Sequence, residues 1–325
     1  MLVAPDIIQV HIPLPFPLKI VNCYLVRGPD GWALIDTGIH WPPALDAWRA
    51  ALNEHGLQPT DIGAIYVTHY HPDHIGLAGW WQRHSGAPVY MTPFEGRTVL
   101  DVWTDGARTE REIAALFQTH GMPTELTLAV GRRAHETQHM TQPLPEVTIL
   151  EHLRADEMLP PLSIMGRAFQ PLVLAGHADE QLCSYESATR TLLSADHVLP
   201  RISPNISILP HSRPDPLGRY LDSFALLAAL DVATVLPGHG LAFTDLNGRL
   251  GELHAHHIER IQAMAAATGD GATAYEVCVR VFPMSELSPH QIQFAMGETL
   301  AHLEHLVFQG QAERVEEAQV RYRMR

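Results

Sequence analysis

Short apolar runs separated by turn residues dominate the first 90 positions of the chain. The runs at 21–26 and 32–35 flank a Gly-Pro-Asp-Gly turn at 28–31 and predict a β-hairpin. Apolar residues spaced along one face, with glycine directly after, predict a helix over 43–55. Strands followed by helices in this way predict a sheet with helices packed outside it.

The same alternation continues through the next elements. The run at 64–67 predicts a strand, 77–84 a short helix, and 89–91 another strand. Residues 92–165 then change to helical spacing, so we interpret this segment as a helical insertion. The insertion is either a lid over a substrate pocket or a surface elaboration.

Two helices are predicted inside the insertion. Thr109 and Glu112 have the spacing of a capping box and would open a helix that stops at Gly121. A second helical stretch runs from Thr124 to about Met140. Neither helix carries a recognisable catalytic motif.

The strand pattern resumes after the insertion. Apolar runs at 172–175, 192–195 and 233–236 predict strands, and a helix is expected over 217–230. Each of these strands, like the one at 64–67, is followed closely by His or Asp and a loop. Side chains placed in this way can converge at one sheet edge, where α/β proteins usually build their sites.

From about residue 250 the chain changes to helices, predicted at 273–281 and 289–308. A hairpin around Glu317 and Ala318 is expected over 313–324. Helices followed by a two-stranded wing are typical of a winged-helix domain. We therefore predict a catalytic domain over 1–248 and a small winged-helix-like domain over 249–325.

Composition narrows the class of protein. The chain has 325 residues, 46% of them hydrophobic and 18% charged, which are values of a globular protein. A formal charge of −14 argues against binding to a phosphate backbone. The three cysteines are far apart and fit a reducing compartment, and no stretch has the length of a membrane span or the form of a signal peptide. We expect a cytoplasmic protein without membrane contact.

The hexapeptide His-Tyr-His-Pro-Asp-His at 69–74 is the most informative motif. It places three imidazoles and a carboxylate within six positions, one residue after a predicted strand. Zinc binds imidazole nitrogen and carboxylate oxygen readily. Other histidines of the chain lack such a context, and we expect packing or solvated roles for them, as at His135, His139, His254, His256, His257, His302 and His305.

Two metal ions that share a bridging ligand need about seven to eight protein ligands. We assign His69, His71 and His177 to one ion. We assign Asp73, His74 and His239 to the other, with Asp196 as the bridge. Asp36, at the end of its own strand, is predicted to accept a hydrogen bond that orients a ligating imidazole.

The order of these motifs, Asp36-Thr37-Gly38, then His69 to His74, His177, Asp196 and His239, resembles the metallo-β-lactamase superfamily in its glyoxalase-II-like branch. The resemblance covers about residues 1–245 and implies an αββα sandwich with a dinuclear site and hydrolytic chemistry. Residues 250–325 are similar to a winged-helix extension of some members. One departure is the sequence Gly-His-Ala-Asp-Glu at 176–180, where the family commonly has Gly-His-Ser/Thr-Pro-Gly.

These features predict a metallo-hydrolase that acts on a small ester, thioester or lactone. Metal-bound hydroxide would attack the carbonyl, and Asp73 or Asp196 would relay a proton to the leaving group. Zinc is the favoured metal, with iron or manganese as alternatives. Substrate contacts are predicted in and after the loop that follows the bridge, at Arg201, Asn205, His211 and Tyr220.

Two other functions remain open. A metal-dependent nuclease would fit the winged-helix extension, but residues 281–313 contain no Lys or Arg, so nucleic acid is an unfavoured partner. An iron-dependent persulfide dioxygenase would use the same scaffold. For the C-terminal domain we expect a packing role or a homodimer contact.

Overall fold

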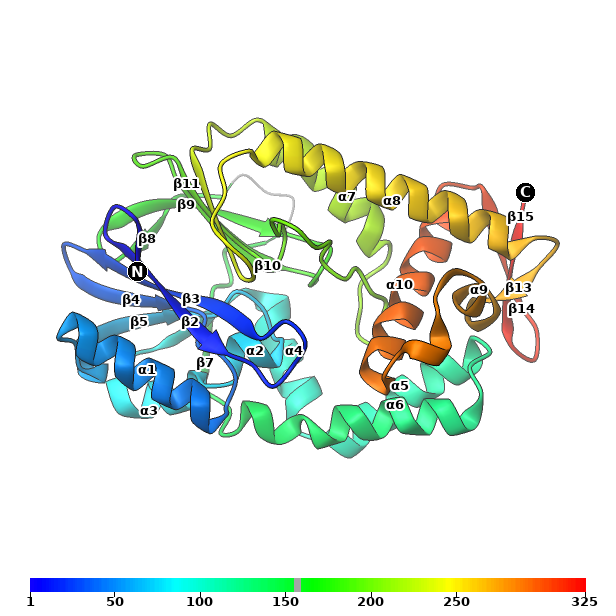
Figure 1. The fold of residues 1–325 in the computed structure, drawn as a ribbon, viewed down its shortest axis with the longest axis horizontal. Coiled ribbons are helices and arrows are strands. Elements are labelled where there is room, and N and C mark those ends of the chain that lie inside the picture. Colours follow the sequence, from blue (N-terminus) through cyan, green and yellow to red (C-terminus); the bar gives the residue numbers. More distant parts are fainter. Residues whose placement is uncertain (155–158) are drawn as a thin grey trace. The chain divides into compact units, whose positions relative to one another are not determined.

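The computed structural model describes residues 1–154 and 159–325, and Figure 1 shows them as a ribbon. The four remaining positions fall within the predicted insertion and lie outside the described residues. The chain forms two compact units. The first unit comprises residues 1–103, 138–204 and 226–249, and the second comprises residues 104–137, 205–225 and 250–325.

Two β-sheets form the framework of the first unit. Within the described residues the larger sheet has seven strands in sequence order: β1 (Leu2–Ala4), β2 (Ile7–Pro13), β3 (Ile20–Gly28), β4 (Gly31–Ile35), β5 (Ile62–Tyr66), β6 (Val89–Met91) and β7 (Val147–Ile149). The five described strands of the smaller sheet run in the order β12 (Thr234–Pro237), β11 (Thr191–Ala195), β10 (Gln181–Glu186), β9 (Arg167–Leu174) and β8 (Leu162–Ile164). The predicted hairpin is β3 and β4.

The two sheets pack face to face, because each strand presents apolar side chains to the other sheet. Buried residues of both sheets form one cluster that includes Tyr24, Val26, Ile35, Ala64, Phe169, Val173, Leu182 and Leu193. The helices α1 (Pro42–His55) and α3 (Ala78–Ser85) cover the outer face of the larger sheet (Figure 1). The predicted α/β class is thereby confirmed.

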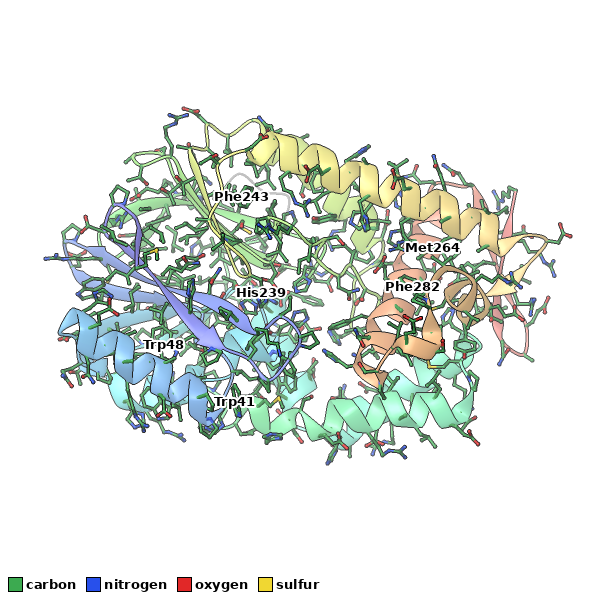
Figure 2. All side chains as sticks on the ribbon, viewed as in Figure 1. Trp41, Trp48, His239, Phe243, Met264 and Phe282 are labelled. Carbon is green, nitrogen blue, oxygen red and sulfur yellow. The ribbon has the colours of Figure 1, made fainter. Side chains whose placement is uncertain are left out.

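Trp48 of α1 and Trp81 of α3 anchor these helices beneath the sheet. Their rings meet edge to face with centroids 5.0 Å apart, and both side chains are fully buried. Trp48 is labelled in Figure 2. Truncating one such buried tryptophan to alanine costs about 3–5 kcal/mol in comparable cores. The helix α1 stops because Gly56 adopts the left-handed φ of 65°, which glycine allows without strain.

The remaining helical elements of the first unit are short. They are α2 (Pro72–Ile75), α4 (Pro93–Trp103) and the 3₁₀ turns at Pro59–Asp61 and Gln138–Thr141. The helix α2 contains the second half of the hexapeptide, and α4 follows β6 directly. Both helices therefore lie at the edge of the sheet where the histidine cluster is located.

The second unit is largely helical. It contains α5 (Gly106–Thr119), α6 (Thr124–Glu136), most of α7 (Pro216–Ala228), most of α8 (Leu246–Thr268), α9 (Ala274–Val281), a 3₁₀ turn (Met284–Glu286) and α10 (Pro289–Phe308). A small sheet has the described strands β13 (Ala272–Thr273), β15 (Val320–Met324) and β14 (Ala312–Glu316) in that order. No helix in the described part of the chain has the length and apolar character needed to cross a lipid bilayer.

The predicted insertion helices pack with the C-terminal residues. Ile113 and Phe117 of α5 and Val130 of α6 share one buried cluster with Met264 and Val277, and Met264 is labelled in Figure 2. Residues 104–137 and 205–225, which the sequence analysis placed inside a catalytic domain over 1–248, are thus part of the second unit. The reason is the apolar face of α5 and α6, which is buried against this cluster.

The start of α5 differs from the predicted capping box. Asp105 is the N-cap, and its side chain accepts a hydrogen bond from the backbone N–H of Arg108. Thr109 and Glu112 lie inside the helix instead, so the prediction was wrong by one turn. Aspartate and threonine are both good helix caps, and the spacing along the sequence did not show whether Asp105 or Thr109 begins the helix.

A histidine pair is buried in the core of the second unit. His257 Nδ1 lies 3.2 Å from His302 Nε2, and His302 Nδ1 donates to the Glu298 carbonyl at 2.7 Å. Burial lowers the pKa of both histidines to about 3. Both imidazoles are therefore neutral in the folded protein, in agreement with the packing role expected from the sequence.

The histidine pair predicts loss of stability in mild acid. An unfolded histidine has a pKa of about 6.5, so below this pH the unfolded chain binds more protons than the folded one, and the free energy of unfolding falls by up to about 1.4 kcal/mol per pH unit for each histidine. His302→Gln keeps a neutral acceptor for His257. Denaturant unfolding between pH 7 and pH 5 should show a shallower fall for this variant, whereas an unchanged slope would contradict the assignment.

Candidate metal centre

The strands of the first unit deliver every predicted metal ligand to one end of the sheets. His69 and His71 follow β5, and α2 begins with Pro72, so that Asp73 and His74 lie in its first turn. The other ligands follow strands of the smaller sheet: His177 after β9, Asp196 directly after β11, and His239 after β12. Because β9, β11 and β12 run in the same direction, their carboxyl ends meet at one edge.

Three imidazole nitrogens form the first ligand group. His69 Nε2 and His71 Nδ1 lie 3.0 Å apart, and His71 Nδ1 and His177 Nε2 lie 2.9 Å apart. A tetrahedral zinc ion with bonds of about 2.0–2.1 Å holds its nitrogen ligands roughly 3.3 Å from one another. Burial, and then the neighbouring imidazoles, hold the pKa of His69 and His71 well below the usual range, so these rings are neutral.

The second ligand group combines carboxylates with imidazoles. His239 Nε2 lies 3.3 Å from Asp73 Oδ2, and His74 Nε2 lies 3.9 Å from the same oxygen. Burial alone would lower the pKa of His239, but the Asp196 carboxylate outweighs this effect and raises the pKa to about 10. The negative carboxylates of this group therefore stabilise positive charge among them. A divalent cation bound between these side chains would supply that charge.

Asp196 lies between the two groups. Its Oδ2 is 3.4 Å from His177 Nε2 of the first group and 3.3 Å from His239 Nε2 of the second. It is also 3.5 Å from His74 Nε2. Although burial opposes it, the imidazoles of His239 and His74 hold the pKa of Asp196 well below the usual range, so the carboxylate is ionised.

The donor set fits a pair of metal ions. Within the described residues, His74 Nε2, His239 Nε2 and Asp196 Oδ1 are buried and have no hydrogen-bond partner. Buried polar atoms are almost always paired, so a converging set of such atoms fits a bound cation as their partner. His69, His71 and His177, and separately Asp73, His74 and His239, each form a group able to hold one ion.

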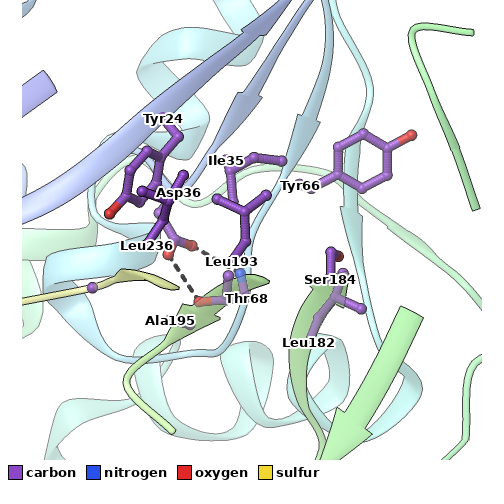
Figure 3. A pocket seen from close by; sticks show the side chains of 11 residues that line it. Tyr24, Ile35, Asp36, Tyr66, Thr68, Leu182, Ser184, Leu193, Ala195 and Leu236 are labelled. Carbon is purple, nitrogen blue, oxygen red and sulfur yellow. Dashed lines mark hydrogen bonds between the residues drawn. The ribbon is translucent and has the colours of Figure 1, made fainter. Parts of the chain in front are cut away.

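Hydrogen bonds behind the ligands fix the orientation of the imidazoles. His74 Nδ1 lies 2.8 Å from Asp36 Oδ2, and Asp36 also accepts from the backbone N–H and the hydroxyl of Thr68 at 2.8 and 2.9 Å (Figure 3). His239 Nδ1 donates to the Ile20 carbonyl at 2.7 Å. In both rings Nε2 is left to face the ligand cluster, which is how ligating histidines are usually held.

Figure 3 shows a small cavity between the two sheets behind Asp36 and Thr68. Its volume is about 10 Å³, and apolar side chains such as Leu193 and Leu236 complete the lining. This space is about that of a single water molecule and cannot hold a substrate. The region behind the cluster therefore supports the ligands and does not bind the reactant.

Two residues of β3 that the sequence analysis did not single out hold the loop with His239. Tyr24 donates its hydroxyl to the Pro237 carbonyl at 2.7 Å, and the Asn22 amide donates to the Pro237 and Gly240 carbonyls at 2.9 and 2.8 Å. The sequence does contain a signal for Asn22, because it is an asparagine inside an apolar strand. A buried amide needs hydrogen-bond partners.

Glu95 is a third residue that the sequence analysis missed. Its side chain is fully buried, and burial raises its pKa to about 8, although the backbone N–H of Glu180 acts in the opposite direction. A glutamate near the start of a helix is, from the sequence, an ordinary surface residue. Nothing in its spacing indicated burial beneath the histidine loop.

The four predicted substrate contacts fall in different units. Arg201 is exposed in the first unit, after the bridging aspartate. The other three belong to the second unit: the Asn205 amide donates to the Phe294 carbonyl, His211 is partly buried, and Tyr220 is fully buried beside Phe224 and His257. Their role in substrate binding stays a prediction.

Gly238, next to His239, has no room for a side chain. A Cβ at this position would lie 2.1 Å from Asp196 Oδ1 and 3.1 Å from His74 Cε1. The Asp196 carboxylate occupies the space that the side chain of any other residue would need. The requirement for glycine at this position thus comes from the ligand cluster itself.

Gly238→Ala should displace Asp196 and reduce the metal content of the purified protein below that of wild type. We expect an overpacking cost of about 1–3 kcal/mol in the free energy of unfolding. Elemental analysis and thermal unfolding measure the two effects. Gly251→Ala is the control, because a Cβ there meets nothing within 4 Å. Full metal content in Gly238→Ala would contradict the placement of Asp196.

Two protein-family models match the chain. The family described as Metallo-beta-lactamase superfamily matches residues 17–239, and that described as Metallo-beta-lactamase-like, C-terminal domain, matches residues 261–325. A probable metallo-hydrolase, YqjP of Bacillus subtilis, is 25% identical over 317 residues, which are 93% of this chain and 92% of that protein.

Two solved structures are similar along nearly the whole chain. The metallo-beta-lactamase family protein TTHA1429 from Thermus thermophilus is 33% identical, with a TM-score of 0.83 and 99% of both chains covered. A beta-lactamase domain protein from Burkholderia ambifaria is 28% identical, with a TM-score of 0.84, and the match covers 100% of this chain and 93% of that chain.

Proposed function

The chain belongs to the metallo-beta-lactamase superfamily and is a metallo-hydrolase, and on this premise we propose that it holds two divalent metal ions and hydrolyses a small ester, thioester or lactone. The observation that carries the dinuclear proposal is the position of Asp196 Oδ2, within 3.5 Å of imidazole nitrogens from both ligand groups. A carboxylate in this position can bridge two ions. The glyoxalase-II-like branch is the part of the superfamily whose motif order this chain resembles.

The proposed ligands are those assigned from the sequence. His69, His71 and His177 would hold one ion, Asp73, His74 and His239 the other, and Asp196 would bind both. Divalent ions held by these residues would supply a Lewis acid that lowers the pKa of a bound water and polarises a carbonyl oxygen. Zinc is the proposed metal, because five imidazoles and two carboxylates without a cysteine suit it, although iron and manganese accept similar donors.

The aspartates of the cluster are the proposed proton carriers. Burial alone would raise the pKa of Asp73, but the imidazoles of His74 and His239 outweigh this effect and hold the pKa below its usual range, so the group is ionised and can accept a proton. Its side chain is 15% exposed, against 7% for Asp196. Asp73 is therefore better placed to take a proton at Oδ2 and return it to a leaving group, while Asp196 remains a bridge.

The C-terminal segment is proposed to be a winged-helix-like packing or dimerisation module. The order of elements from α8 to β15 is helix, strand, helix, helix and two strands, which is compatible with a winged helix. The arginines of β14 and β15 are paired with glutamates: Arg314 with Glu304 and Glu316, Arg321 with Glu276, and Arg323 with Glu317. Cations paired in this way are poorly suited to hold phosphates.

His71→Ala should abolish hydrolysis of a generic ester or lactone and leave the fold intact. His71 contributes a nitrogen that lies within 3.0 Å of those of His69 and His177, so its loss removes one of three ligands of the first ion. The measurement is turnover with p-nitrophenyl acetate and a γ-lactone, together with metal content and circular dichroism. Retained turnover would refute the metal mechanism.

A substrate panel separates the proposed function from its alternatives. We expect turnover of carbonyl substrates such as lactones and glutathione or coenzyme A thioesters, and at least 100-fold less with bis-p-nitrophenyl phosphate or RNA. Preferred cleavage of phosphodiesters would favour the nuclease. Oxygen uptake with a persulfide, together with iron in the isolated protein, would favour the dioxygenase.

A further inference from the structure

Glu95 hydrogen-bonds to two loops that are far apart in the sequence. Its Oε2 accepts from the backbone N–H of Tyr70 at 3.2 Å, and its Oε1 accepts from the backbone N–H of Glu180 at 2.9 Å. Tyr70 lies between the ligands His69 and His71. Glu180 lies in the turn that follows the ligand His177, so one buried carboxylate joins the two loops.

The joined loops contribute to the same ligand group. His71 Nδ1 and His177 Nε2 lie 2.9 Å apart, although 106 positions separate the two residues in the chain. A backbone hydrogen bond from Leu182 N–H to the Thr68 carbonyl, 2.9 Å long, connects the same two segments on the side of the sheets. The Glu95 carboxylate is the side-chain connection between them.

Helix α4 binds the peptide of Tyr70 with both of its ends. While Glu95 near the helix start accepts from the Tyr70 N–H, the indole of Trp103 at the helix end donates to the Tyr70 carbonyl at 2.8 Å. Both backbone groups of the residue between His69 and His71 are thus bound by one rigid element. The histidine loop therefore has little freedom to move relative to α4.

The turn after His177 is also bound directly to the start of α4. The Glu180 side chain accepts from the backbone N–H of Phe94 at 2.8 Å, and the Thr92 hydroxyl donates to the Glu180 carbonyl at 2.7 Å. This turn belongs to the Gly-His-Ala-Asp-Glu sequence that departs from the family's common motif. Its glutamate, buried to 3% exposure, links the turn to α4 and the residue before it through three hydrogen bonds.

We propose that Glu95 is a positioning residue of the metal centre, whose carboxylate fixes the separation of His71 from His177 by holding the two loops that carry them. This inference rests on the proposed metal function. It predicts that the carboxylate controls the affinity and the geometry of the first ion and not only the stability of the fold.

The role requires two acceptor oxygens. Burial raises the pKa of Glu95 to about 8, but a protonated carboxyl keeps acceptor capacity on its oxygens, so the side chain can accept from both backbone N–H groups in either form. An amide at this position has one oxygen and would turn its NH₂ group against the other N–H. A buried N–H that faces another donor is left unpaired, so this change weakens the connection between the loops. Glu95→Gln is therefore a nearly isosteric change that releases one of the two loops.

The matched control is Glu186→Gln. Glu186 is a buried carboxylate of the same unit, with 4% exposure, and its partners are Arg167 and Thr189 and no ligand loop. Both variants lose a buried carboxylate, so a purely structural effect would appear in both. Only Glu95→Gln should alter the metal centre.

The experiment loads metal-free protein with Co²⁺ and follows its visible absorption, with a chromogenic chelator in competition. Glu95→Gln should bind the first Co²⁺ about 10–100-fold more weakly than wild type and show a shifted absorption band, as expected when a partner of the ligands is removed. Glu186→Gln should match wild type in both. Equal affinity and spectrum in Glu95→Gln would overturn the inference.

Two further results keep the test decisive. If Glu95→Gln does not fold, Glu95→Asp is used instead, because it keeps both oxygens on a shorter side chain. Glu95→Asp should shift the Co²⁺ absorption band, whereas its control, Glu186→Asp, should not. If wild type binds no Co²⁺, the proposed metal function fails and this inference with it. If wild type binds Co²⁺ and the Glu95 variants match it, the inference alone fails.

Discussion

Placing several imidazoles and carboxylates in one buried site costs free energy unless their polar atoms are paired or held by neighbouring groups. In this protein His71 Nδ1 lies within 3.0 Å of nitrogens from His69 and His177, and Asp196 adds an oxygen within 3.5 Å of His177. Such a cluster keeps its arrangement only if the surrounding groups hold each side chain in place. Most of the special features of the first unit can be understood as answers to this requirement.

The supporting groups act on the backbone and on the far sides of the rings. Asp36 and the Ile20 carbonyl each bind the Nδ1 atom of a ligand ring, so that Nε2 faces inward. Asn22 and Tyr24 hold the loop of His239, and the absence of a side chain at Gly238 leaves room for the Asp196 carboxylate. The geometry of the cluster therefore depends on residues outside it, and these residues are spread over several strands.

The second unit is built around an apolar core of helices. Its core combines α5 and α6, from the middle of the chain, with helices and strands from the C-terminus, through buried side chains such as Phe117, Val277 and Leu300. Its charged strands pair arginine with glutamate on their own surface. These features are those of a packed scaffold, and they agree with an overall charge that does not favour nucleic acid.

The sequence alone predicted about half of the strands, most helices and the candidate ligands, because periodicity and motif order are local properties of the chain, but it did not predict β2 or β10. The predicted ranges 89–91 and 289–308 agree with β6 and α10, and the order of His and Asp after strands indicated a shared edge. Only the tertiary structure decided which unit contains α5 and α6, where Asp105 rather than Thr109 begins a helix, and that Glu95, Asn22 and Tyr24 support the site. Most of those outcomes depend on contacts between residues far apart in the chain, as between Asn22 and Gly240, and the spacing of residues along the sequence does not encode such contacts.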